Sequence, residues 1–197
     1  MSFGISARRI FMALALASAA FLATSCASPP LNLYTLEASD AAARVTPSVG
    51  KVKVVEIRRA AVPDFLDNQD ILVRRGSTLV RSSQGRWASR LSLGATHFVT
   101  GQLAQRRPDI LITDQPQIEP PDYQVFLTIS TLDVRATGTA TMEADWLIVP
   151  RNAALPSQRK RGGFSATGST ATDQDVVSLN TALLQQLTDA IAASSPW

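Results

Sequence analysis

The sequence predicts an α+β fold: a single domain in which two long helices pack on one face of an antiparallel sheet. Short runs of alternating apolar and polar residues, typical of strands, recur along most of the chain. Helical spacing of apolar residues occurs in two longer segments, 83–104 and 172–191. About 170 residues remain once the N-terminal leader described below is set aside, enough for one domain with a hydrophobic core. Strand runs with two helices interposed favour the α+β class.

The first half of the domain is predicted to contain strands and a hairpin. Residues 32–36 and 51–57 are short runs rich in apolar and β-branched residues, so each predicts a strand. Residues 71–74 and 78–80 flank the turn sequence Arg75-Gly76-Ser77 and predict a β-hairpin.

The first helix is predicted from Ser83 to Ala104 and is ended by Pro108. Its apolar face is defined by residues three or four apart: Trp87, Leu91, Ala95, Phe98 and Gln102. A short strand is expected over 109–113.

Residues 123–134 form the clearest strand of the sequence. Its first apolar residues share one face, whereas Leu132 and Val134 fall in the opposite phase. A β-bulge near Ser130-Thr131 would restore one buried face. Residues 140–148 alternate in the same way and predict the return strand.

The chain then continues through a basic connection, 151–161, into a strand over 162–169 and a final helix. Thr172 and Asp175 have the spacing of a capping box at the start of that helix. Its apolar stripe consists of Val176, Leu179, Leu183, Leu187 and Ile191.

The N-terminal segment has the features of a lipoprotein signal peptide, residues 1–25. Arg8 and Arg9 precede a short uncharged apolar stretch, and small residues then lead to Cys26, the only cysteine. This order resembles a bacterial lipobox, in which the thiol is acylated, with palmitate as one expected chain, and becomes the first mature residue. Two alternatives are an ordinary signal peptide with a free cysteine and a twin-arginine export signal.

Lipidation of Cys26 would hold the domain close to its membrane. Residues 26–31 form a short tether that reaches about 20 Å when extended. Ala27 stands where an aspartate would signal retention in the inner membrane, so the resemblance to sorted lipoproteins implies the periplasmic face of the outer membrane. A domain held in this way cannot search for its partner, which must come to it.

Few residues of the sequence suit catalysis. His97 is the only histidine, which argues against a zinc site or a Cys/His pair, and no glycine-rich phosphate loop is present. Asp133, Glu143 and Asp145 are carboxylates near one hairpin, where a solvated sheet surface is favoured over acid–base chemistry. Without the leader the net charge is about +1, which disfavours nucleic acid as a partner. We therefore expect a non-catalytic protein without cofactor or metal.

One concentrated charge feature remains, the basic connection with Arg151, Arg159, Lys160 and Arg161. These residues would contact phospholipid headgroups or an acidic partner, or they would form only the solvated end of a hairpin. Trp87 is expected in the core, whereas Trp197 at the C-terminus is expected to be exposed or frayed.

Short motifs occur at Tyr34-Thr35-Leu36, at Val62-Pro63-Asp64-Phe65-Leu66-Asp67 and at Arg86-Trp87-Ala88. Their order along the chain resembles that of the ABC-type transport auxiliary lipoproteins, which accompany MCE-domain lipid transport systems. The resemblance spans residues 32–197, and one departure is Ser89-Arg90, where the family often has Glu-Pro. The motif residues, for which a structural role is expected, are Tyr34, Leu36, Pro63, Leu66, Arg86, Trp87 and Leu91.

The resemblance implies a non-enzymatic component that docks an MCE-domain protein and its ABC permease and ATPase to the outer membrane. It also implies action in several copies, since MCE assemblies are rings. Two alternatives are a lipoprotein that activates a periplasmic enzyme and a direct lipid carrier.

Overall fold

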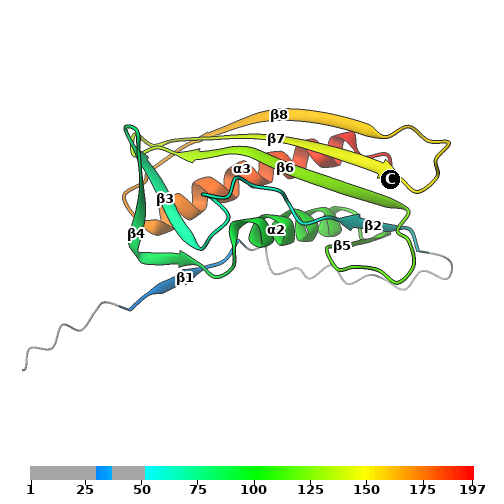
Figure 1. Cartoon of the computed structure of the whole chain (residues 1–197), viewed down its shortest axis with the longest axis horizontal. Coiled ribbons are helices and arrows are strands. Elements are labelled where there is room, and N and C mark those ends of the chain that lie inside the picture. Colours follow the sequence, from blue (N-terminus) through cyan, green and yellow to red (C-terminus); the bar gives the residue numbers. More distant parts are fainter. Residues whose placement is uncertain (1–29, 37–51) are drawn as a thin grey trace, which may run out of the picture. The chain divides into compact units, whose positions relative to one another are not determined.

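The structure, a computed structural model, describes residues 30–36 and 52–197 of the chain (Figure 1). The predicted signal peptide and Cys26 lie outside the described residues, as does most of the predicted tether. The chain divides into two units, Met1–Pro30 and Leu31–Trp197, and the second is the folded domain.

The described part of the domain contains two β-sheets and two helices, which confirms the predicted α+β class. One sheet has three strands in the order β1-β4-β3, and the other has five in the order β5-β2-β6-β7-β8. The strands are β1 (Asn32–Tyr34), β2 (Val54–Ile57), β3 (Asp70–Arg75), β4 (Thr78–Trp87), β5 (Leu111–Thr113), β6 (Tyr123–Val134), β7 (Thr139–Pro150) and β8 (Gln158–Thr167). The helices are α2 (Leu91–Arg106) and α3 (Asp173–Ser194).

Both sheets are mixed, although the sequence predicted antiparallel pairing. β1 runs parallel to β4, and β2 runs parallel to both of its neighbours, β5 and β6. The β3–β4, β6–β7 and β7–β8 pairs are antiparallel as predicted. The difference follows from connectivity, because the long path from β2 through β3, β4 and α2 to β5 provides the crossover that a parallel pair needs.

The β6–β7 hairpin confirms the predicted strand and its bulge. β6 has the bounds expected from the sequence, and its register with β7 shifts between Ile129 and Thr131. After the shift Leu132 pairs with Met142, so the apolar residues again share one face. Gly138, with φ 89°, occupies the turn between the two strands in a conformation that favours glycine.

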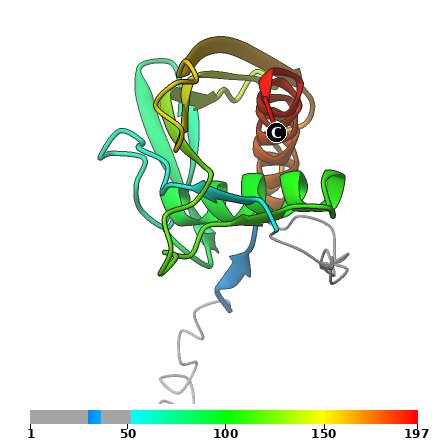
Figure 2. The same ribbon diagram turned by 90° about the vertical axis from the view of Figure 1, so that its right-hand side faces the viewer.

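The two helices pack against each other and against the five-stranded sheet. α3 lies against β7 and β8, and α2 lies against α3 and β5 (Figures 1 and 2). The predicted capping box is present, with Thr172 and Asp175 exchanging side-chain to backbone hydrogen bonds. All five residues of the predicted α3 stripe are buried. Within the described part of the chain, no helix has the length and apolar character needed to cross a bilayer.

The first predicted helix begins later than expected. Residues 83–87 belong to β4, because Gly85–Trp87 pair with β1 and Arg86 pairs with Asp70 of β3. The helix starts at Leu91, after a break at residues 88–90. Trp87 is buried, as predicted, but at the end of a strand. The four-residue spacing of Trp87 and Leu91 therefore matches the period of a helix, although Trp87 belongs to a strand.

The C-terminal tryptophan is docked on the domain, so the expectation of an exposed or frayed end was wrong. Trp197 is 8% exposed, and its ring centroid lies 5.4 Å from that of Tyr123. The Arg107 guanidinium donates a hydrogen bond to the Trp197 carbonyl oxygen. The sequence ended in polar and small residues before this tryptophan and therefore carried no local sign of its docking.

Candidate functional site

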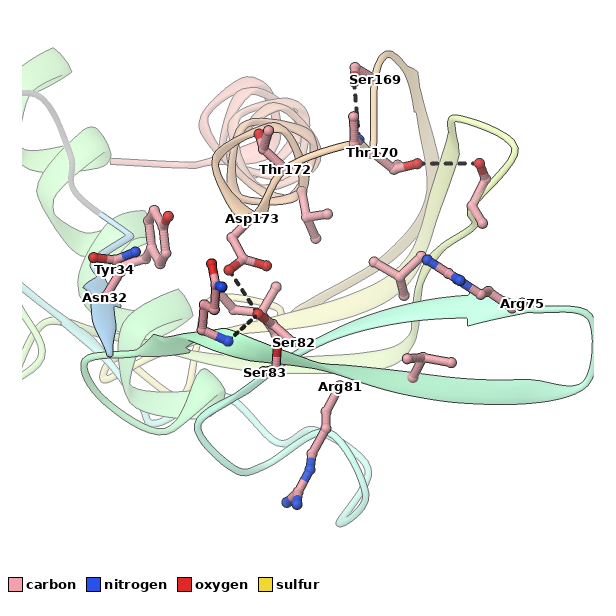
Figure 3. A pocket seen from close by; sticks show the side chains of 17 residues that line it. Asn32, Tyr34, Arg75, Arg81, Ser82, Ser83, Ser169, Thr170, Thr172 and Asp173 are labelled. Carbon is pink, nitrogen blue, oxygen red and sulfur yellow. Dashed lines mark hydrogen bonds between the residues drawn. The ribbon is translucent and has the colours of Figure 1, made fainter. Parts of the chain in front are cut away.

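A groove of about 880 Å³ lies between β1, the β3–β4 hairpin and the start of α3 (Figure 3). Its deeper lining is apolar and includes Ile71 and Val176, both buried. Its outer lining is rich in hydroxyl and amide groups, among them Ser83, Gln84 and Thr172. The groove can therefore accommodate an extended segment that is apolar on one side and hydrogen-bonding on the other.

The end of the groove at α3 is anionic and tightly built. Ser82 Oγ donates a 2.7 Å hydrogen bond to Asp173 Oδ2, which joins β4 to the first turn of α3. Asp173 and Asp175 in this first turn interact favourably with the helix dipole. Hydrogen bonds from Ser169 and Thr172 hold the pKa of Asp175 below its ordinary value. Figure 3 shows Arg81 pointing away from the groove.

The sequence analysis did not identify this groove. Its polar residues come from β4 and from the segment before α3, which lie far apart in the chain and carry no recognisable motif. One signal was available, since Asp173 follows the predicted capping residue Thr172 and was placed at a helix start. The sequence could not show that β4 approaches that helix start.

The second candidate surface is the free edge of β8. β8 ends the five-stranded sheet, so one of its edges has no strand partner among the described residues. Gln186 Nε2 donates a 3.0 Å hydrogen bond to the Ser165 carbonyl oxygen, which covers part of this edge near α3. An edge with unpaired backbone groups can accept an additional strand from another chain.

Three of the four predicted basic contact residues lie in β8. The sequence placed Arg159, Lys160 and Arg161 in a connection, whereas β8 already begins at Gln158 and pairs with β7 through this stretch. Strand alternation puts Arg159 and Arg161 on one face and Lys160 on the other, opposite Trp146. The three cations therefore lie along an edge, and they do not form a patch on one face.

The ion pairs of β8 leave positive charge at its start. Arg159 Nη1 lies 3.6 Å from Asp145 Oδ1, and the Arg159 side chain is 70% exposed. Within the part of the chain that the structure describes, neither Lys160 nor Arg161 has an ion-pair partner. The beginning of β8 is thus an exposed strand edge with excess positive charge.

Arg151 is separated from the other three. It follows β7, and its side chain donates a 3.3 Å hydrogen bond to the Pro120 carbonyl oxygen of a neighbouring loop. There it lines a hollow of about 440 Å³ with Lys53, Tyr123 and Leu155. The structure therefore does not bring the four predicted basic residues into one site.

The motif residues of the sequence analysis form a corner where β1, β4 and α2 meet. Tyr34 lines the groove, and its carbonyl oxygen accepts a 2.7 Å hydrogen bond from the Ala88 N–H. Arg86 Nε lies 3.2 Å from Asp70 Oδ1. The Pro63 carbonyl oxygen accepts a 2.8 Å hydrogen bond from the Leu66 N–H in a tight turn. The remaining motif residues are buried in the core: Leu36, Leu66, Trp87 and Leu91.

A network beside this corner was not predicted. Arg59 Nε donates to Ser92 Oγ at 2.9 Å, and Arg59 Nη2 donates to Asp67 Oδ2 at 3.1 Å. Burial alone would raise the pKa of Asp67. Hydrogen bonds from Ser92 and the positive charges of Arg59 and Arg90 outweigh that effect, so the pKa of Asp67 lies below its ordinary value. This network fixes the turn at residues 63–68 against the start of α2.

The carboxylates considered for catalysis have individual structural environments. Asp133 is buried and accepts hydrogen bonds from Arg74 and Arg135. Glu143 is exposed on β7, and Asp145 pairs with Arg159. The His97 side chain is 77% exposed, and its Nδ1 lies 3.3 Å from Asp114 Oδ2. Among the described residues, no cluster of three or more potential ligands is placed to hold a metal ion.

Comparison with known proteins identifies related sequences and folds. A family model described as "ABC-type transport auxiliary lipoprotein component" matches residues 34–192. One solved structure, of an uncharacterized protein, is 15% identical, with 83% of this chain and 97% of that chain covered and a TM-score of 0.67. The structure of protein XCC0632 from Xanthomonas campestris is 15% identical in sequence, with 82% of this chain and 92% of that chain covered and a TM-score of 0.61. No curated protein matches the sequence. At this identity the solved structures show a shared fold only.

Proposed function

Because the chain belongs to the family of ABC-type transport auxiliary lipoprotein components, we propose that it is a non-enzymatic subunit that docks a transporter to a membrane. In this proposal Cys26 carries the lipid anchor, and the domain lies on the periplasmic face of the outer membrane. The docked assembly contains an MCE-domain protein with its ABC permease and ATPase, and its cargo is phospholipid. The family match over residues 34–192 is the observation that carries this proposal.

The free edge of β8 supports a docking role. An exposed strand edge can bind a partner through backbone hydrogen bonds, and nearby charges then select among partners. Lys160 and Arg161 favour a partner segment with acidic side chains. The same charges also discourage association of the edge with unrelated strands. This surface therefore suits one specific interaction.

The proposal is tested by recovering the lipidated protein from envelope extracts together with its partners. We expect an MCE-domain protein and permease subunits in the purified complex. The double variant Lys160→Glu/Arg161→Glu should reduce this recovery roughly tenfold, because two reversed charges at an interface rim change affinity by about 1–2 kcal/mol. Arg81→Glu is the matched control, because Arg81 is an exposed arginine on β4, which belongs to the three-stranded sheet and not to the sheet that contains β8.

Three results would contradict the proposal. Recovery of no transport component would remove its basis, and recovery of a cell-wall synthase or another periplasmic enzyme would favour the regulatory alternative. An equal loss for Arg81→Glu and the β8 variant would exclude β8 as the docking edge.

The groove beside β1 supports a second candidate function, direct lipid binding. Its apolar deeper lining can contact an acyl chain, and its hydroxyl groups can contact a headgroup. Mass spectrometry of the purified domain would detect retained phospholipid. A domain free of lipid after purification in mild detergent would contradict this candidate.

A further inference from the structure

Two leucines, one at the end of the predicted tether and one in β1, face away from the domain. In β1 Asn32 and Tyr34 line the groove (Figure 3). Strand alternation therefore directs Leu31 and Leu33 to the other side. Leu31 is 53% exposed and Leu33 is 65% exposed. This orientation is inverted relative to a usual edge strand, which turns its apolar residues inward.

Single exposed leucines are common on protein surfaces, so exposure alone identifies no partner. The position of these two in the chain is more specific. Leu31 follows Cys26 by five residues, which span about 17 Å at most when extended. An acyl group on Cys26 inserts into the hydrocarbon core, and the headgroup region adds only about 5–8 Å on each side. The leucines therefore stay within reach of the bilayer interface.

We propose that Leu31 and Leu33 form a bilayer-contact strand that inserts into the headgroup boundary beside the lipid anchor. This inference rests on the proposed function through the anchor at Cys26. The occupant of this surface is the membrane itself. Apolar side chains at the interface add to the hold of acyl chains and restrict the orientation of the domain.

A defined orientation has a consequence for docking. β1 and the loop that joins β7 to β8 lie at opposite ends of the view in Figure 1. With β1 on the bilayer, the start of β8 and its cations are directed away from that membrane. The candidate docking edge is then presented to a partner that approaches from the periplasm.

Fluorescence quenching in vesicles tests the contact. Cys26 is the only native cysteine and its thiol is acylated, so an introduced cysteine is the only thiol available to a bimane label. Leu33→Cys, Asn32→Cys and Leu155→Cys variants of the lipidated protein are labelled and reconstituted into phosphatidylethanolamine/phosphatidylglycerol vesicles that contain brominated phosphatidylcholine. Leu155 is the distal control, because it is 47% exposed in the loop after β7.

We expect at least a twofold loss of bimane fluorescence at position 33, a smaller loss at position 32, and none at position 155. Co-flotation with the vesicles reports the anchor independently of the label. Protein that floats with the vesicles but is not quenched at position 33 would overturn the bilayer contact and leave the anchor intact. Equal quenching at positions 33 and 155, or a blue shift at 33 without quenching, would also overturn it. Protein that fails to float would overturn the anchor and the contact together.

Discussion

Gly85 of β4 lies directly against Asp173 of α3: a β-carbon at Gly85 would be 2.3 Å from Asp173 Oδ2 and 3.1 Å from Ile71 Cδ1. The absence of a side chain at this glycine lets the strand approach the helix start. Asp173 is also held by its hydrogen bond from Ser82, so the carboxylate cannot move without losing that bond. One glycine therefore sets the separation of two elements that line the groove.

Gly85→Ala should destabilise the domain by about 1–3 kcal/mol, because the added methyl group displaces Asp173. Urea unfolding measured by circular dichroism gives this difference. Gly163→Ala is the matched control, because a β-carbon there would meet nothing within 4 Å. Its expected change is within about 0.5 kcal/mol. Similar stability of the two variants would contradict the close approach.

Asp133→Asn should cost about 1–3 kcal/mol of unfolding free energy. Asp133 Oδ1 lies 2.6 Å from Arg74 Nε, which links β3 to the five-stranded sheet, and Asp133 Oδ2 lies 3.1 Å from Arg135 Nε. An amide at this buried position can accept only one of these charge-assisted bonds. Glu143→Gln, an exposed carboxylate on the neighbouring strand, should leave the urea midpoint unchanged. An equally small effect at Asp133 would show that the link between the sheets is dispensable.

Trp197→Ala should lower stability by about 2–4 kcal/mol, because the indole fills a site beside Tyr123. Thermal unfolding is a suitable measurement. Trp197→Phe keeps an aromatic ring at this site, so this variant should lose clearly less stability than Trp197→Ala. A melting temperature that does not change in the alanine variant would mean that the C-terminus is not docked in solution.

Stability should fall as the pH decreases from about 4 toward 2. A hydrogen bond from Arg107 lowers the pKa of Asp109 from 3.8 to about 2, and the pKa of Asp175 is also below its ordinary value. Because the folded pKa values are lower than the unfolded ones, the unfolded state binds protons first. The stabilisation that these two carboxylates provide is complete above pH 4 and is lost as the pH falls through their folded pKa values. The double variant Asp109→Asn/Asp175→Asn should show a flatter melting temperature over this range, and an unchanged slope would contradict the assignment.

Cys26→Ala should release the protein into the soluble periplasmic fraction, because the acyl chains would be absent. Fractionation of cell envelopes followed by immunoblotting measures the distribution. Ser28→Ala leaves Cys26 in place and should remain in the membrane fraction. Membrane association of the Cys26→Ala variant would contradict lipidation as the anchor.

Local patterns in the sequence predicted the elements whose residues contact near neighbours in the chain. The β6–β7 hairpin, its bulge and the capping box of α3 belong to this class. The α3 stripe was also predicted, because a 3.6-residue period over several turns has few alternative explanations. These features depend on residues close together in sequence, so a single sequence contains their signals.

Features that depend on distant segments were missed. Nothing local in 83–87 shows that β1 pairs with Gly85–Trp87, and the helical spacing through Trp87 and Leu91 was misleading. The docking of Trp197 depends on Arg107 and Tyr123 from other elements. The groove was missed for the same reason, because its walls come from β1, β4 and the start of α3. The basic residues of β8 were identified as charged, but their division between two faces followed only from the strand register.

The parallel position of β2 between β5 and β6 has a consequence for the order of folding. Val55 pairs with Ile112 on one side and with Tyr123 on the other, so both neighbours of β2 are more than fifty residues further along the chain. A polypeptide delivered N-terminus first holds β2 unpaired until β5 has followed, and paired on only one edge until β6 has followed. During that interval Val55 and Ile57, which are fully buried in the folded domain, are in contact with water. Assembly of the central sheet is therefore a late step, and protection of this strand during export would favour correct folding.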